Sequence, residues 1–270
     1  MNKLKKLFTG PYNYFFKKDQ VLRFSPAEGG LCKKHSKFGA RIFQVKTMLI
    51  KYNQKRLYNS KSVRPDYMRP YLFLALHTEA KRTTNPAGGY YADQVLILKM
   101  LLSVLPDEWM VYIKEHPVQL DINLSSQRPR RSGYYDELRV SDRVRFVDAE
   151  EIPFKLIDHA KAVATICGDP GWEAVNRGVP ALLFGEAWYQ GCEGTFRISS
   201  REQCLEAIEA IKSGYRVDHE RVRLFWKAIE KSTAEASISM SERKHLGIDY
   251  DKNIDTISEL LHRELANIRS

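Results

Sequence analysis

Two short motifs carry the residue types that bind phosphate. Lys114-Glu115-His116-Pro117 offers a cation and an imidazole, and Gly168-Asp169-Pro170-Gly171-Trp172-Glu173-Ala174 offers a glycine-rich turn that opens a helix. Each motif directly follows an apolar run typical of a buried strand, Trp109 to Ile113 and Ala162 to Ile166. Because open α/β sheets bind ligands at the carboxyl ends of their strands, the pattern indicates a nucleotide-phosphate site.

The elements around these motifs alternate between strand and helix signals, which predicts an α/β fold, a Rossmann-like parallel sheet with right-handed crossovers. The expected strands are Tyr71 to Leu76, Trp109 to Ile113, Val144 to Val147, Ala162 to Ile166 and Pro180 to Phe184. The expected helices are Asp93 to Leu105, Tyr134 to Leu138, Ile152 to His159, Gly171 to Arg177, and one ending at Lys212 that the capping box Ser199-Ser200-Arg201-Glu202 opens.

Charge divides the chain into regions. Residues 1–70 contain 17 Lys+Arg against 3 Asp+Glu, whereas the rest of the chain contains 26 against 30. We expect a basic linker at 1–70, a Rossmann-like domain with both phosphate motifs at 71–215 and charged C-terminal helices at 216–270. The basic region is a solvated connector, a surface for anionic lipid or an arm for nucleic acid. No nucleic-acid module accompanies the charge, so we expect no nucleic acid and leave a peripheral membrane contact open.

Several protein classes are disfavoured by composition. The apolar run Val95 to Leu105 is interrupted by Lys99 and is shorter than the roughly 20 residues that span a bilayer. The basic start, Met1 to Phe8, lacks the apolar core of a signal peptide. No Cys-x-x-Cys pair or His cluster at ligand spacing occurs, so we expect no metal, no disulfide framework and a cytoplasmic location. The cysteines are Cys32, Cys167, Cys192 and Cys204.

Further blocks between Leu76 and Arg197 keep the order and spacing of a known family. They are Leu76-His77-Thr78-Glu79, Asn85-Pro86-Ala87-Gly88-Gly89 with Asp93-Gln94, the two phosphate motifs with Ala164-Thr165, and Phe184-Gly185 with Ala187-Trp188-Tyr189. In these blocks the chain resembles the C-terminal, donor-binding half of capsular and surface-polysaccharide biosynthesis proteins. Those are two-domain GT-B glycosyltransferases related to the capsule Kdo transferases.

The resemblance implies a metal-independent glycosyltransferase at the inner face of the cytoplasmic membrane. Its donor would be a nucleotide sugar, with CMP-Kdo as the expected type, and its acceptor a glycan or glycolipid. The nucleotide sugar is a co-substrate, and no cofactor is expected. Stabilising the leaving phosphate without a metal requires helix N-terminal amides, imidazole, hydroxyls and cations.

The resemblance also implies roles for individual residues. His116, stiffened by Pro117, would hydrogen-bond the phosphate, and Lys114 would add charge if it faces the cleft. Glu173, expected in the first turn of its helix, would hold a ribose or sugar hydroxyl, or would only stabilise the helix dipole. Gly168 and Gly171 would let the backbone approach the ligand, or would only form the turn. The expected donor-binding set is Lys114, His116, Pro117, Thr165, Gly168, Gly171, Trp172 and Glu173.

Other side chains near the strand ends rank lower. His77 and Glu79 follow the first strand and would face the interdomain cleft. Trp172 and Trp188-Tyr189 would wall the pocket, although packing is the commoner role of aromatic residues at a sheet edge. Arg128, Arg130 and Arg131 could clamp a phosphate, but such a charge run is usually a solvated loop, and we leave them out of the site.

Two departures from the family pattern bear on activity. Cys167, Asp169 and Pro170 stand where relatives usually have small hydroxyl residues, and at about 4 Å a carboxylate repels a phosphate by roughly 1 kcal/mol in water and more in a partly buried site. Residues 1–70 are also too short for the N-terminal acceptor domain that commonly supplies the catalytic base, so the catalytic residue is unknown.

Three hypotheses follow from these observations. The first is a glycosyltransferase that builds a surface polysaccharide. The second is a non-catalytic or split half-enzyme, which binds nucleotide and pairs with a partner chain that supplies the acceptor domain. The third is a nucleotide-sugar epimerase-like enzyme on the same fold.

Overall fold

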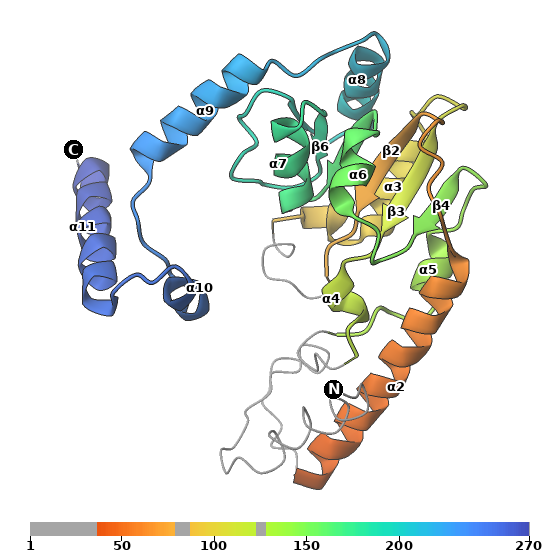
Figure 1. Ribbon diagram of the computed structural model, residues 1–270, viewed down its shortest axis with the longest axis horizontal. Helices are drawn as coiled ribbons and strands as arrows, with labels where there is room; N and C mark the ends of the chain where they lie inside the picture. The colour runs from red at the N-terminus through yellow and green to blue at the C-terminus, as the bar shows by residue number, and fades with distance from the viewer. Residues whose placement is uncertain (1–36, 79–86, 123–127, 270) are drawn as a thin grey trace. The chain divides into compact units, whose positions relative to one another are not determined.

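The fold is described from a computed structural model, which covers residues 37–78, 87–122 and 128–269. Two compact units make up the chain, Met1–Asp218 and His219–Ser270. The first unit holds a seven-stranded sheet, and the second is helical (Figure 1).

All strand pairs of the sheet are parallel, in the order β1-β4-β3-β2-β5-β6-β7. From β2 the chain adds β3 and β4 on one side and then returns to add β5, β6 and β7 on the other. The order therefore reverses between β2 and β5, which is where doubly wound sheets bind ligands. The strands are β1 (Ser62–Val63), β2 (Tyr71–Ala75), β3 (Met110–Lys114), β4 (Val144–Val147), β5 (Ala162–Thr165), β6 (Ala181–Leu183) and β7 (Thr195–Arg197).

The structure confirms the predicted α/β class and each of the five predicted strands. β1 and β7 were not predicted; both are very short and lie at the two edges of the sheet. Helices and one 3₁₀ turn connect the strands. They are α2 (Lys37–Lys61), η2 (Gly89–Ala92), α3 (Gln94–Leu102), α4 (Pro117–Leu120), α5 (Tyr134–Glu137), α6 (Pro153–Asp158), α7 (Asp169–Asn176) and α8 (Arg201–Lys212).

Side-chain caps fix where two of these helices begin. Asp93 caps α3, its carboxylate accepting the Val95 N–H at 3.2 Å. Ser200 caps α8, its hydroxyl accepting the Gln203 N–H at 3.3 Å, while Gln203 accepts the N–H of Ser199. The cap is therefore one residue later than predicted, and Gln203 bonds the N–H of Ser199, the residue before the cap, instead of closing a capping box on Ser200.

Alternate residues of the buried strands pack on opposite faces of the sheet. Leu72 and Leu74 of β2 belong to a core that includes side chains of α3 and α8, whereas Tyr71 and Phe73 belong to a second core with side chains of α6 and α7. Every residue of β2 and β3 is buried. The sheet is therefore covered on both sides, as a parallel sheet requires.

Helix α2 is part of the folded unit, whereas the sequence predicted a linker over residues 1–70. Tyr58 is fully buried, and its hydroxyl donates to the carbonyl of Val147 at 2.5 Å. Lys51 is 1% exposed, and its ammonium donates to the carbonyl of Asp121 at 2.7 Å. The helix leads directly into edge strand β1, so the sheet's unit begins before the expected boundary.

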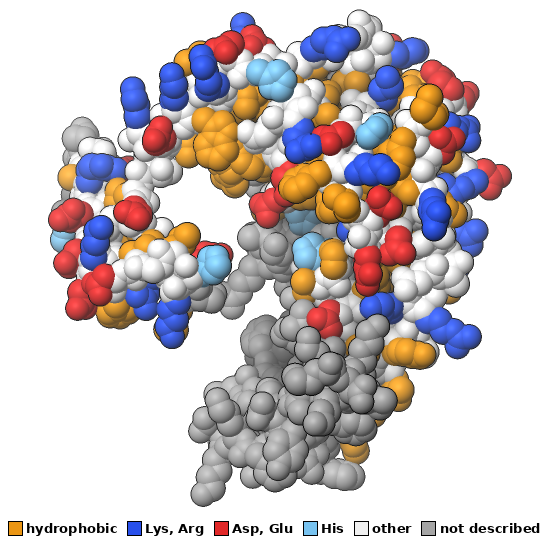
Figure 2. All heavy atoms as spheres, in the orientation of Figure 1, with side chains coloured by type: hydrophobic (Ala, Val, Ile, Leu, Met, Phe, Trp, Pro, Cys, Tyr) orange, Lys and Arg blue, Asp and Glu red, His pale blue; other side chains and the backbone are white. Residues whose placement is uncertain are grey.

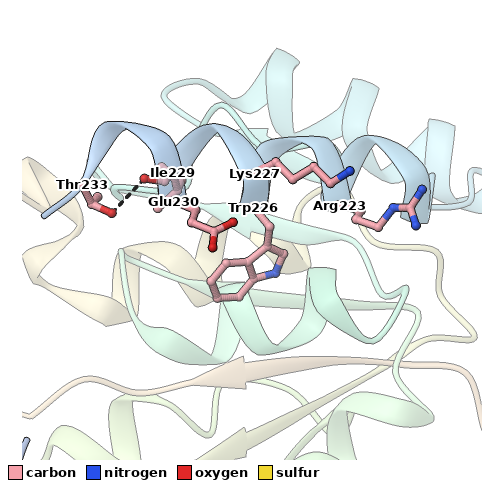
Figure 3. A pocket seen from close by; sticks show the side chains of 6 residues that line it. All are labelled: Arg223, Trp226, Lys227, Ile229, Glu230 and Thr233. Carbon is pink, nitrogen blue, oxygen red and sulfur yellow. Dashed lines mark hydrogen bonds between the residues drawn. The ribbon is translucent and has the colours of Figure 1, made fainter. Parts of the chain in front are cut away.

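The second unit contains three helices, α9 (His219–Ser232), α10 (Met240–His245) and α11 (Tyr250–Arg269). Asn253 of α11 is buried and exchanges two hydrogen bonds with the backbone of Ser237, which ties α11 to the segment before α10. Figure 3 shows a hollow lined along α9 by Arg223, Trp226, Lys227, Ile229, Glu230 and Thr233. These side chains come from α9 and the residue that follows it, and we place no site there.

Candidate functional site

His77 and Thr165 meet where the strand order reverses. His77 follows β2, Thr165 ends β5, and Nε2 of His77 lies 2.8 Å from the hydroxyl oxygen of Thr165. Both residues are buried. Gln94 at the start of α3 holds His77 in place, accepting its N–H at 2.7 Å and donating to its carbonyl at 3.2 Å. Residues from two predicted blocks therefore meet where the strand order reverses, which is the place where sheets of this kind bind ligands.

Gly168 packs directly against this pair. Its N–H donates to the Thr165 hydroxyl at 3.3 Å. A Cβ on Gly168 would lie 2.9 Å from Nε2 of His77 and 3.2 Å from the Thr165 hydroxyl oxygen. Close packing inside the protein therefore requires glycine at this position. The sequence indicated two other reasons for a glycine, which were close approach of the ligand and the geometry of the turn.

Gly171 is confined in the same way by Tyr189. A Cβ on Gly171 would lie 2.4 Å from the Tyr189 hydroxyl oxygen and 3.0 Å from Cγ2 of Thr165. That hydroxyl donates to the carbonyl of Gly168 at 2.5 Å. Burial raises the pKa of Tyr189, so the phenol keeps its proton and remains a donor at neutral pH. Tyr189 thus packs against the glycine-rich turn and restrains it.

Helix α7 begins at Asp169, earlier than the sequence predicts, which changes the position of Glu173. Asp169 is the acidic residue of the first turn, and Glu173 lies one turn further on. The prediction that Glu173 occupies the first turn is wrong, and the favourable interaction with the helix dipole belongs to Asp169 instead. Burial, and then the negative charge of Asp169, raise the pKa of Glu173, while Arg177 lowers it.

His116 lies at the neighbouring strand end and caps α4. Its Nδ1 accepts the N–H of Val118 at 3.2 Å, and Pro117 occupies the first turn of the helix. In a neutral imidazole with Nδ1 as acceptor, the proton sits on Nε2, which makes that nitrogen a hydrogen-bond donor. The side chain is half-buried and Pro117 is exposed.

Lys114 does not present its charge at the strand ends. The residue is 5% exposed, and its ammonium donates to the carbonyl of Ala149 at 2.7 Å. Burial lowers the pKa of Lys114, while Asp148, Glu115 and Glu151 raise it. The condition for its predicted role, that it faces the cleft, is therefore not met.

A buried ion pair between Glu115 and Arg130 supports the β3 end instead. Nε and one terminal nitrogen of Arg130 lie 2.9 and 2.8 Å from the carboxylate of Glu115, and both side chains are almost fully buried. The carboxylate also accepts the Tyr135 hydroxyl at 3.0 Å and the N–H of His116 at 2.8 Å. Burial lowers the pKa of Arg130, but Glu115, Tyr134 and Tyr135 together raise it above its usual value, so the guanidinium stays charged.

Arg130 also connects the two site histidines. The terminal nitrogen that binds Glu115 donates to the carbonyl of His77 at 2.5 Å, and Gln54 of α2 exchanges two hydrogen bonds with the Arg130 backbone. The sequence prediction that leaves Arg130 out of the site misses this supporting role. Glu115 comes two residues after the apolar run Trp109 to Ile113. A carboxylate that becomes buried there must be paired, and that rule together with the later arginines is the signal that could have identified the pair.

Trp172 and Trp188 form an aromatic pair beside the start of α7. Their ring centroids are 4.8 Å apart, and Trp172 lies 5.7 Å from the ring of Tyr189. Trp188 is 55% exposed, whereas Tyr189 is fully buried. Tyr189 is thus a packing residue, and only the tryptophans of this group present aromatic surface to solvent.

The structure gathers most of the predicted set at one edge of the sheet. His77, Thr165 and Gly168 are in contact, a Cβ on Gly171 would lie 3.0 Å from Cγ2 of Thr165, and His116 follows the adjacent strand β3. Glu79 lies outside the described residues. Among the residues that the structure describes, no group of His, Cys, Asp and Glu side chains could hold a metal ion.

Solved structures are similar to this chain at low sequence identity. UDP-GlcNAc 2-epimerase from Methanocaldococcus jannaschii is 13% identical with a TM-score of 0.42, over 70% of this chain and 53% of that one. The β-Kdo 2,7 transferase KpsC from Thermosulfurimonas dismutans is 16% identical with a TM-score of 0.39, over 69% of this chain and 64% of that one. The chain therefore spans only about half to two thirds of their lengths. Similarity this distant does not define an activity.

A comparison with individual curated proteins gave no match. The family model for capsule polysaccharide biosynthesis proteins matches residues 32–201, which include α2, all strands of the sheet and both phosphate motifs. The match agrees with the blocks of sequence at the strand ends and covers more than half of the chain. This chain is a member of the capsule polysaccharide biosynthesis protein family.

Proposed function

We propose that this chain binds a nucleotide sugar at the carboxyl edge of β2, β3 and β5 and acts as the donor-binding half of a GT-B glycosyltransferase. The donor is a CMP-activated acidic sugar of the Kdo type, and the acceptor is a growing surface glycan or glycolipid at the inner face of the cytoplasmic membrane. The transfer uses protein groups rather than a metal to stabilise the leaving phosphate. The family membership and the site geometry support this proposal.

The observation that carries the proposal is the contact between His77, Thr165 and Gly168 at the reversal of strand order. The start of α7 directly follows Gly168, so the positive end of its dipole is directed at the same crevice. His116 adds an Nε2–H donor from the next strand. A diphosphate or phosphodiester fits this combination of a helix N-terminus and imidazole donors, because both stabilise negative oxygen.

A second candidate, a nucleotide-binding half-enzyme without turnover of its own, has a specific observation in its favour. Asp169 is exposed in the first turn of α7, where an incoming phosphate would lie, and it already raises the pKa of Glu173. A carboxylate at this place weakens phosphate binding. Such a chain would depend on a partner chain for the acceptor domain and the catalytic base.

Nucleotide titration tests the site common to both candidates. We expect CMP, CDP or UDP to bind the purified protein, with the cytidine nucleotides tightest, in isothermal titration calorimetry. His116→Ala should weaken binding about tenfold through loss of a hydrogen bond to a charged group. His159→Ala is the matched control, because His159 is exposed directly after α6, where it contacts the carbonyl of Lys155 and the ring of Tyr67 and none of the proposed site residues. An unchanged dissociation constant for His116→Ala would refute the phosphate role.

Product analysis separates the enzyme classes. A transferase consumes a sugar nucleotide only when an acceptor is present, whereas an epimerase converts it without one. We expect no conversion of the nucleotide sugar in the absence of an acceptor. Conversion without an acceptor would establish the epimerase-like alternative, and nucleotide binding without turnover under either condition would establish the half-enzyme.

A further inference from the structure

Helix α2 turns a polar stripe toward the protein and an apolar stripe away from it. Thr47 and Lys51 are buried and Gln54 is half-buried against the sheet's unit. Outward-facing residues at spacings of three, four and three form the opposite stripe, so they share one side of the helix. They are Ile42, Val45, Leu49 and Tyr52, with exposed fractions of 53, 54, 60 and 55%. We call these four residues the α2 stripe.

Between Ile42 and Gln54 this arrangement inverts the usual amphipathic helix, whose apolar side faces the core, whereas Tyr58 near the end of α2 is buried in the core. Hydrophobic side chains lie along α2 at the surface in Figure 2, where Figure 1 places this helix. A contiguous apolar surface of this kind marks an interaction site.

The charge around the α2 stripe indicates which kind of partner would bind there. The 25 residues of α2 include seven Lys or Arg and no Asp or Glu. Lys46 and Arg56 are exposed, lie within one turn of Leu49 and Tyr52, and form no ion pair with any residue that the structure describes. A second copy of this helix would bring like charges together, so a homodimer through α2 is disfavoured. The chemistry fits an anionic surface with an apolar interior.

We propose that the α2 stripe inserts into the surface of a bilayer that contains anionic lipid, with Lys46 and Arg56 at the head groups. Apolar side chains flanked by Lys and Arg are typical of helices that lie in the membrane interface. No helix within the described part of the chain is long and apolar enough to cross a bilayer. Residues 1–70 as a whole contain 17 Lys+Arg against 3 Asp+Glu, so the positive charge of this part of the sequence is not confined to α2. Vesicle binding needs no nucleotide, so the result of this test is independent of the proposed function.

The test is co-sedimentation of the full chain with vesicles of phosphatidylcholine alone or of equal parts phosphatidylcholine and phosphatidylglycerol. We expect binding to the anionic vesicles only, and weaker binding as salt screens the charge. Lys46→Gln with Arg56→Gln should lower the partition coefficient about 25-fold, and Ile42→Ser with Leu49→Ser about tenfold or more. The matched control is Leu261→Ser with Leu265→Ser, which replaces side chains of similar exposure on α11 and should change nothing.

Several results would overturn the proposal. Equal binding to neutral and anionic vesicles, or no binding to either, would refute an anionic membrane contact. Binding that both α2 double variants leave unchanged would place the contact elsewhere in the chain. Sedimentation velocity that shows a dimer of the full chain, dissociated by Leu49→Ser, would make a second copy the occupant. Circular dichroism of each variant must match the wild type, and Leu49→Met serves as a conservative variant that should retain binding.

Discussion

The carboxyl ends of β3 and β5 lie at the same edge of the sheet, but different interactions stabilise them. Beyond β3, a buried carboxylate and guanidinium hold the backbone, with Glu115 bonded to the N–H of His116 and Arg130 to the carbonyl of His77. Beyond β5, the side chains of His77, Thr165 and Tyr189 leave no room for a Cβ on Gly168 or Gly171. The first end should therefore be sensitive to loss of charge, and the second to added volume.

The largest effect is expected at the β3 end. Arg130→Met removes the guanidinium and leaves the Glu115 carboxylate buried without its cation, which should lower the free energy of unfolding by about 3–5 kcal/mol. Urea denaturation followed by circular dichroism measures this change. It should also disorder the loop that carries His77, because Arg130 binds its carbonyl.

Two further variants control this prediction. Arg128→Ala alters an exposed side chain of the same arginine run and should change stability by no more than about 0.5 kcal/mol. Glu115→Leu combined with Arg130→Met removes both charges, and should recover part of the stability lost in the single variant. A single variant within about 1 kcal/mol of the wild type would show that the ion pair does not hold this end.

At the β5 end, Gly171→Ala should lower the free energy of unfolding by about 1–3 kcal/mol through overpacking. The added methyl would clash with the Tyr189 hydroxyl at 2.4 Å. Tyr189→Phe removes that oxygen, so the double variant should be less destabilised than the sum of the two single variants. Gly191→Ala is the control, since a Cβ there has no neighbour within 4 Å. Strict additivity would mean that the two residues do not restrain each other.

Much of the fold could be predicted because the signals are local. Apolar runs bounded by turn residues located β2 to β6, and the strand–helix alternation required a parallel order. Helix α2 could not be placed in this way. Its regular apolar residues face outward, while the residues that attach it, such as Lys51 and Gln54, are polar and bond to backbone groups distant in the sequence. The periodicity of apolar residues in the sequence contains no information on such contacts.

The site shows the same division. The positions of His116 and Gly168 at strand ends follow from the fold, because parallel strands end at a common edge. Side-chain directions do not. β3 is buried on both faces, so its pattern contains no alternation to show that Lys114 turns inward to Ala149. The pairing of Glu115 with Arg130 depends on the course of the intervening loop, and the start of α7 depends on Gly168 rather than Gly171 as its cap.

The smallest expected effect concerns the charge at the β5 end. Asp169 and Glu173 are four residues apart on α7, and such like-charged pairs cost a few tenths of a kcal/mol. Because the pKa of Glu173 is raised in the folded protein, the folded state keeps this proton to higher pH than the unfolded state. Stability is therefore lost as pH rises from the ordinary Glu pKa through the raised value, and no loss from this group occurs below that window.

Asp169→Asn should lower the pKa of Glu173 and so narrow the pH range over which stability is lost. NMR titration of the side-chain carboxyl carbon of Glu173 measures this change. Unfolding free energy is a poorer measure, because the same substitution removes an anion from the first turn of α7, which costs about 0.3–1 kcal/mol and opposes the gain. Asp142→Asn, at an exposed position before β4, should leave the Glu173 titration unchanged. If Asp169→Asn also leaves it unchanged, burial alone raises the pKa, and the β5 end is governed by packing without a contribution from charge. A lowered pKa together with tighter nucleotide binding would instead show that Asp169 opposes both the ionisation of Glu173 and the arrival of a phosphate.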